Sequence, residues 1–114
     1  MNLPEVGSMI LDRKTSLCWK VAVSERFTHY EGFEEWESMS IECVGYDGSY
    51  HTLDDSDLFS GERYVFLEPM QVLDVAKCVT EQALSCKDAK IQRELCLKAI
   101  WLLQWFEKET TNAL

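Results

Sequence analysis

The sequence predicts an α+β fold, with a small antiparallel five-stranded sheet or barrel over about residues 6–68 and a C-terminal helical hairpin or bent helix. Two observations carry this prediction. Up to residue 68, short apolar runs alternate with polar residues between turn-forming stretches, whereas from Met70 the apolar period lengthens to about 3.6 residues. The chain of 114 residues also suits one domain with a real core. We therefore expect a single domain over residues 1–114, with a β part up to residue 68 and a helical part at 69–109.

The first two expected strands form a hairpin near the N-terminus. Residues 6–12 read as a short strand, and the polar residues 13–16 read as a turn. Residues 17–24 alternate as a second strand, which places one set of apolar side chains on a single face. That set is Leu17, Trp19, Val21 and Val23.

The next stretch, residues 25–38, does not show a strand pattern. Gly32 interrupts it, its aromatic residues follow roughly a three-residue period, and acidic residues fill the gaps. We expect an ordered loop here, with one helical turn at residues 33–37. A loop of this length within a compact domain is often functional.

A second hairpin is the clearest structural signal of the chain. Residues 41–44 and 50–53 are strand-like, and residues 46–48 have the form of a three-residue loop with Gly48 in the left-handed conformation. This loop sets Ile41 opposite Leu53 and Val44 opposite Tyr50, which pairs apolar residues on both faces.

An acidic run, residues 54–57, follows this hairpin. It reads as a tight turn that brings Leu58 and Phe59 inward, and residues 63–68 then form the last strand, which Pro69 closes.

The remaining chain is helical. The apolar pattern predicts one helix from Met70 to about residue 84 and a second from Asp88 to about residue 108. Residues 85–88 could cap the second helix or could be a bend in one long helix, since no Gly or Pro forces a break. The last residues, 110–114, are expected to fray.

The end of the second helix is apolar on nearly all sides. Its three largest side chains each bury on the order of 150–250 Å² when covered, so something must cover them. Either the strands of the β part do so, or part of this surface forms a homodimer interface. The residues concerned are Trp101, Trp105 and Phe106.

The β part resembles a small barrel of the Tudor type over about residues 6–68. The resemblance rests on the Val-Gly-Tyr-Asp-Gly run at residues 44–48 and on the Leu-Asp-Asp-Ser-Asp-Leu run at residues 53–58. It implies a peptide-binding reader or adaptor with an aromatic cage that holds a methylated Lys or Arg by cation–π contact. The side chains available for the cage are Tyr30, Trp36, Tyr46 and Tyr50, with Asp47 as the counter-charge. The simpler expectation is that these rings lie in the core or in an interface.

The net charge of −9 is concentrated in one segment. Residues 27–68 carry eleven of the twenty acidic residues and one basic residue, Arg63. A one-sided acidic field excludes direct nucleic-acid binding and suggests either a basic protein partner or simple solubility. The leading hypothesis is a non-enzymatic interaction protein, such as an inhibitor, antitoxin or immunity protein, that covers a basic and possibly nucleic-acid-binding surface. Its expected partner-binding residues are Glu31, Glu34, Glu35, Trp36, Glu37, Asp47, Asp54, Asp55 and Asp57.

An enzyme is the third hypothesis. His51 lies among acidic residues and could support acid–base chemistry, yet the chain lacks a phosphate-binding glycine loop, a nucleophile elbow and metal-ligand spacing. The five cysteines are odd in number, widely spaced and flanked by apolar residues, so we expect buried thiols rather than a zinc site or disulfides. No cofactor is expected. The absence of a signal sequence and of a long apolar run predicts a cytoplasmic protein without a membrane anchor.

Overall fold

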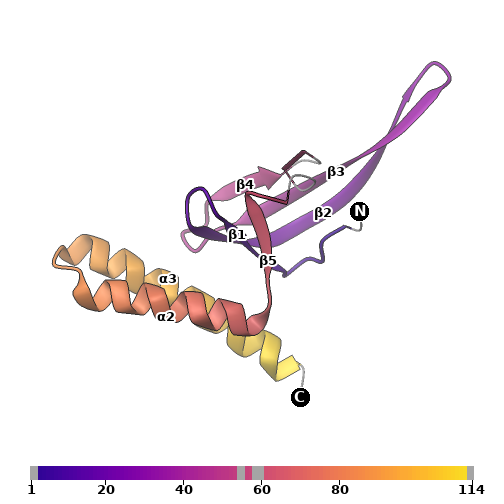
Figure 1. Cartoon of the computed structure of the whole chain (residues 1–114). Coiled ribbons are helices and arrows are strands. Elements are labelled where there is room, and N and C mark those ends of the chain that lie inside the picture. Colours follow the sequence, from indigo (N-terminus) through magenta and orange to yellow (C-terminus); the bar gives the residue numbers. More distant parts are fainter. Residues whose placement is uncertain (1–2, 54–55, 58–60, 113–114) are drawn as a thin grey trace. The chain divides into compact units, whose positions relative to one another are not determined.

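The structure is a computed structural model that describes residues 3–53, 56–57 and 61–112. The chain divides into two compact units, Met1–Phe66 and Leu67–Leu114. The first unit contains the sheet and the second contains two helices (Figure 1).

Five strands form one antiparallel sheet in the order β4-β3-β2-β1-β5. The strands are β1 (Met9–Asp12), β2 (Leu17–Glu31), β3 (Glu34–Val44), β4 (Tyr50–Leu53) and β5 (Tyr64–Leu67). The predicted α+β class is confirmed. Of the two predicted forms, the protein has the sheet, because β4 and β5 end it as edge strands and it does not close into a barrel.

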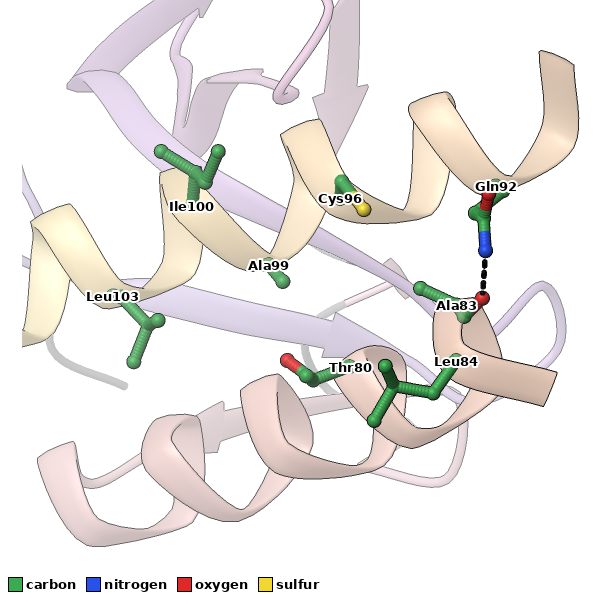
Figure 2. Close-up of a pocket in the computed structure, with 8 residues that line it drawn as sticks. All are labelled: Thr80, Ala83, Leu84, Gln92, Cys96, Ala99, Ile100 and Leu103. Atoms are coloured by element: carbon green, nitrogen blue, oxygen red, sulfur yellow. Dashed lines mark hydrogen bonds between the residues drawn. The ribbon is translucent and has the colours of Figure 1, made fainter. Parts of the chain in front are cut away.

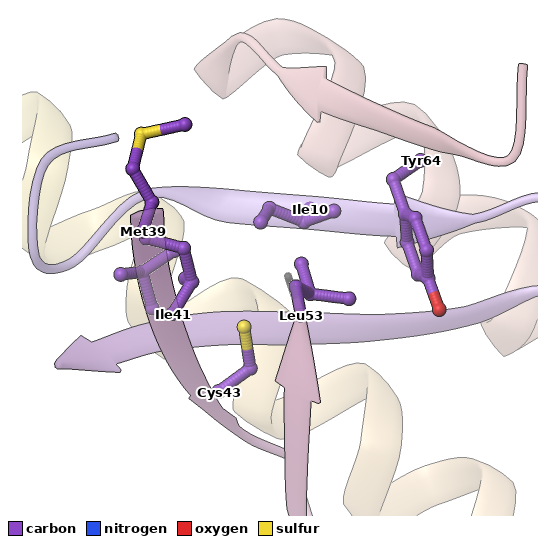
Figure 3. Close-up of a cluster of buried hydrophobic side chains, with 7 residues drawn as sticks. Ile10, Met39, Ile41, Cys43, Leu53 and Tyr64 are labelled. Carbon is purple, nitrogen blue, oxygen red and sulfur yellow. The ribbon is translucent and has the colours of Figure 1, made fainter. Parts of the chain in front are cut away.

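The core of the sheet gathers side chains from all five strands (Figure 3). Ile10, Ile41 and Leu53 are almost fully buried, and Trp19 packs against the cluster from its edge. Alternate residues of a strand face the same side, which is why Met39, Ile41 and Cys43 of β3 all reach this core. The full cluster is Ile10, Val21, Met39, Ile41, Cys43, Leu53 and Tyr64.

The alternation predicted for the second strand holds only in part. Trp19 and Val21 face the core cluster, but a bulge between Val21 and Val23 adds one residue to β2. Val23 therefore pairs with Glu42 and faces the other side of the sheet. The prediction that Val23 shares the face of Trp19 is wrong for this reason.

The register of β3 and β4 is the one predicted. Ile41 pairs with Leu53 and Val44 with Tyr50. The amide of Gly45 donates to the carbonyl of Ser49 over 2.9 Å, and the amide of Gly48 donates to the carbonyl of Gly45 over 3.1 Å. These bonds close the three-residue loop, with Gly48 at φ +82°.

Replacing Gly48 with Ala is expected to lower the free energy of unfolding by about 1 kcal/mol, because an L side chain is strained at positive φ. No described atom would clash with the new Cβ, since none outside the two chain neighbours of Gly48 lies within 4 Å of that position. The loss therefore measures backbone strain alone. Urea denaturation of the two proteins tests it, with Thr52→Ala at an exposed position of β4 as the control. A stability equal to that of the unmodified chain would contradict this turn geometry.

The predicted loop at residues 25–38, with its helical turn at 33–37, is wrong. These residues continue β2 and β3 as one long hairpin, in which Glu31 pairs with Glu34. Gly32, at φ +61°, is the first central residue of the two-residue turn, as a type II′ turn requires. Gly32 thus marks the tip of a hairpin and not a break in structure.

The second unit is a pair of helices, α2 (Pro69–Ser85) and α3 (Ala89–Asn112), so the alternative of one bent helix is wrong. Pro69 is the first helical residue of α2, and the side chain of Gln71 accepts the amide of Glu68 over 2.7 Å. Asp88 caps α3, because its carboxylate accepts the amides of Lys90 and Ile91.

The predicted frayed tail begins too early. α3 continues to Asn112, and the hydroxyl of Thr110 donates to the carbonyl of Phe106 over 2.8 Å. Residues 113–114 lie outside the described residues, as do Leu58 and Phe59, for which the sequence predicts an inward position.

Candidate functional site

A two-stranded arm is the main exposed feature of the sheet. β1 pairs with β2 only up to Lys20, and β4 pairs with β3 only from Ile41. Within the described part of the chain, residues 24–40 therefore have no strand on either side, and they extend beyond the other strands (Figure 1). We call residues 24–40 the β-arm.

One face of the β-arm carries rings. Partners across an antiparallel pair share a face, so Phe27, His29 and Trp36 lie on the same side. The rings of His29 and Trp36 stack with centroids 5.3 Å apart and planes inclined by 14°. Phe27 and Trp36 each keep 45% of their surface exposed. We call this side the aromatic face.

Acidic residues surround these rings. Glu25, Glu31 and Glu34 share the aromatic face by the same register. The hydroxyl of Ser38 lies 2.6 Å from Nε2 of His29 and holds that ring in place. The aromatic face thus combines exposed ring faces with three carboxylates.

The opposite face of the β-arm is more polar. It carries Tyr30, Glu35 and Glu37, and Glu37 forms an ion pair with Arg26 at 3.8 Å. Both partners of this pair are well exposed, so it contributes little to stability. Phe33, at the tip, is fully exposed.

The aromatic face can bind cations. A guanidinium or ammonium group gains from contact with a ring face, most strongly with Trp, and a neighbouring carboxylate adds an ion pair. Leaving several large rings in water is unusual on a monomer without a partner. A two-stranded ribbon is also only marginally stable alone, so a partner that covers it would stabilise it.

The structure brings together only some of the predicted partner-binding residues. Glu31, Glu34, Glu35, Trp36 and Glu37 all lie on the β-arm, divided between its two faces. Asp47 lies in the β3–β4 turn, at the other end of β3. Asp57 lies near Arg63, whose pKa is raised mainly by the hydrogen bond to Asp12 and only slightly by the charge of Asp57. Asp54 and Asp55 lie outside the described residues.

The β3–β4 turn uses Asp47 structurally. Its carboxylate accepts the hydroxyl of Ser49 over 2.6 Å and the amide of Ser49 over 3.1 Å. These bonds lower the pKa of Asp47. Asp47 therefore stays charged while it holds the turn.

The four rings expected for an aromatic cage do not lie together. Tyr30 and Trp36 project from opposite faces of the β-arm. Tyr46 and Tyr50 lie at the β3–β4 turn, and Trp36 is about 25 Å from that end of β3 at the usual rise of about 3.3 Å per residue. The rings that do gather around Trp36 are those of the aromatic face.

His51 belongs to a second cluster, which holds the edges of the sheet together. Its Nε2 and the hydroxyl of Tyr64 are hydrogen-bonded over 2.8 Å, so β4 is joined to β5. The ring of His51 stacks on Trp19 with centroids 5.0 Å apart. His51 thus has a structural environment among rings, and no carboxylate is among its described contacts.

The polar end of this cluster is an ion pair whose carboxylate is buried. Arg63 donates two hydrogen bonds of 3.0 Å to the carboxylate of Asp12, which is 1% exposed. These bonds lower the pKa of Asp12 from 3.8 to about 2, although burial acts in the opposite direction. The guanidinium also lies over the ring of Tyr64 at 5.0 Å.

Sequence reasoning missed two of these features. The sequence pattern predicts a loop at Glu25, Phe27 and His29, although the order Glu-Arg-Phe-Thr-His-Tyr-Glu before Gly32 is compatible with a strand leading into a tight turn. The pair of Asp12 and Arg63 had no signal in the sequence, since its partners are far apart along the chain.

The cysteines differ from expectation. Cys18 and Cys43 are buried, and burial raises the pKa of Cys43 to about 11. Cys86 is partly exposed and Cys78 and Cys96 are exposed, so the prediction that all five are buried is wrong.

Among the residues that the structure describes, no group of three or more His, Cys, Asp or Glu side chains could hold a metal ion. Neither helix in the described ranges is long and apolar enough to cross a membrane. Comparison with protein-family models, with curated proteins and with solved structures finds no match.

Proposed function

We propose that this protein is a non-enzymatic binding protein that docks its β-arm on a basic surface of another protein. The observation that carries the proposal is the aromatic face, where Phe27, His29 and Trp36 lie among three glutamates on a ribbon that no other described strand flanks. Rings of this kind supply contact area at low entropic cost, and Trp and Tyr are common anchors in interfaces. The partner's matching chemistry is Arg and Lys side chains.

The charge of the chain supports the same proposal. Acidic residues on an exposed arm attract a basic protein before contact, which raises the association rate. An inhibitor, an antitoxin or an immunity protein uses this chemistry to cover a basic surface where phosphates would lie. We therefore place the protein in that class of binders, with a nucleic-acid-binding protein as the expected target.

Neutralising the β-arm is expected to weaken partner binding by about tenfold or more at low salt. The arm variant is Glu25→Gln/Glu31→Gln/Glu34→Gln, and the control is Glu5→Gln/Glu81→Gln/Glu94→Gln, which removes the same charge from exposed positions elsewhere. The partner is first identified by affinity capture from the host cell at low and high salt, and is then purified. Its association with each variant is measured against ionic strength.

The same association measurement shows which face of the β-arm contacts the partner. Trp36→Ala removes the largest ring of the aromatic face, and Tyr30→Ala removes a ring from the opposite face. The proposal requires Trp36→Ala to weaken binding strongly and Tyr30→Ala to leave it nearly unchanged. Equal binding by the arm variant and its control, without salt dependence, would refute the docking of this arm.

A further inference from the structure

The helical unit has an exposed apolar stripe on α3. Among the described side chains of α3, the buried ones are Ala99, Leu102 and Trp105. On another side of α3, Ile100 is 50% exposed and Leu103 is 42% exposed. The predicted interface residue Trp105 therefore has little surface left for a second copy, and Trp101 and Phe106 are only partly exposed.

The spacing of this stripe is regular. Its residues follow each other at intervals of three and four, which is the repeat of a helix that packs along another helix. All of them are exposed in the single chain. We call this set the outer stripe. It consists of Arg93, Cys96, Ile100, Leu103 and Glu107.

A groove beside the outer stripe adds to the apolar surface. It lies between α2 and α3 and has a volume of about 270 Å³ (Figure 2). Leu84 of α2 and Leu103 of α3 reach toward it. The amide group of Gln92, its most polar neighbour on α3, donates to the carbonyl of Ala83 over 2.8 Å and so is already engaged. The groove therefore suits an apolar surface.

We infer that the outer stripe binds the outer stripe of a second copy of this chain, with the two α3 helices antiparallel. A two-fold axis at Ile100 places the two Ile100 side chains against each other. It also places Arg93 of each copy opposite Glu107 of the other, because both lie at equal intervals from Ile100. Leu97 of each copy, another exposed residue, then lies opposite Leu103 of the other.

The charges at the two ends of the outer stripe favour a second copy of this chain as the partner, with the two α3 helices antiparallel. Within the described ranges, neither the Arg93 nor the Glu107 side chain has an ion-pair partner in its own chain. An antiparallel pair satisfies both charges twice, whereas a parallel pair would set like charges side by side. The stripe is thus complementary to itself in one orientation.

The dimer has a consequence for binding. Each copy carries one β-arm, so a dimer carries two and could bind a partner with two basic surfaces more tightly than a monomer. The dimer itself does not depend on the function proposed for the β-arm.

Charge reversal tests the interface. Arg93→Glu or Glu107→Arg alone places two like-charged pairs at the interface and should weaken dimerisation by about 10- to 100-fold. The double variant Arg93→Glu/Glu107→Arg should restore the dimer. Lys87→Glu and Glu94→Arg are matched controls that make the same charge changes away from the stripe, and Ile100→Glu should abolish the dimer. Sedimentation equilibrium over a range of concentrations gives the dissociation constants.

Circular dichroism confirms that each variant is folded before its oligomeric state is interpreted. A monomeric unmodified chain at every concentration would overturn the inference. A dimer that is insensitive to both single reversals, or that the double variant fails to restore, would also overturn it.

Discussion

Replacing Asp12 with Asn is expected to lower the free energy of unfolding by about 2 kcal/mol at neutral pH. The carboxylate is 1% exposed and accepts both hydrogen bonds of Arg63, and its pKa is about 2 against an ordinary value of 3.8. A pKa difference of this size between the folded and the unfolded chain corresponds to a contribution of about 2 kcal/mol to the free energy of unfolding. Asn keeps the shape of the side chain but carries no charge. The decrease in stability therefore measures the contribution of the charged pair.

The same variant should change the pH dependence of stability. The folded pKa of Asp12 is depressed, so its contribution is present above pH 3.8 and is lost as the pH falls toward about 2. Urea denaturation at neutral and acidic pH measures both effects, with Glu42→Gln on the exposed side of β3 as the control. The difference between Asp12→Asn and the unmodified chain should shrink as the pH falls through this window. A constant difference would contradict the role of the charge.

Replacing Ile41 with Ala should lower the free energy of unfolding further, by about 2–5 kcal/mol. Ile41 is fully buried, and Leu53, its partner across the strand, is 1% exposed. The substitution leaves a cavity that the neighbouring side chains of the core cluster cannot fill, because the backbone of β3 is held between β2 and β4.

Ile41→Val provides the graded control, with an expected loss of about 0.5–1.5 kcal/mol. Thermal or urea denaturation measures both variants, and the order of the losses follows the volume removed. Equal small decreases in the free energy of unfolding for the two substitutions would show that Ile41 is not packed in the core of the sheet.

The sequence predicted the short strands because burial leaves a pattern there. Ile41, Leu53, Trp19 and Val21 reach one core and are separated by polar residues, so both the alternation and the register of β3 and β4 could be read. The β-arm has no such pattern over residues 25–37, since these residues are exposed on both of its faces apart from the half-buried His29. Its aromatic residues therefore followed no two-residue period, and the predicted loop was wrong.

Part of the candidate site was accessible from composition. The excess of acids and the presence of Trp36 pointed to the β-arm, but not to which residues share a face. That division depends on the pairing of Glu31 with Glu34, because a shift of one residue would move Trp36 to the other side. Asp47 and Asp57 were grouped with the arm only because they are near it in sequence.

By itself, the sequence of this protein determined the α+β class, the order of its strands and helices, the β3–β4 turn and the acidic character of its middle segment. These features are local, since they depend on periodicity, turn residues and charge. Only the tertiary structure decided the length of the β-arm, the side on which its rings lie, the pairing of Asp12 with Arg63 and the exposed stripe of α3. Each of these depends on which residues of distant segments meet and which are left uncovered, and no local pattern records that.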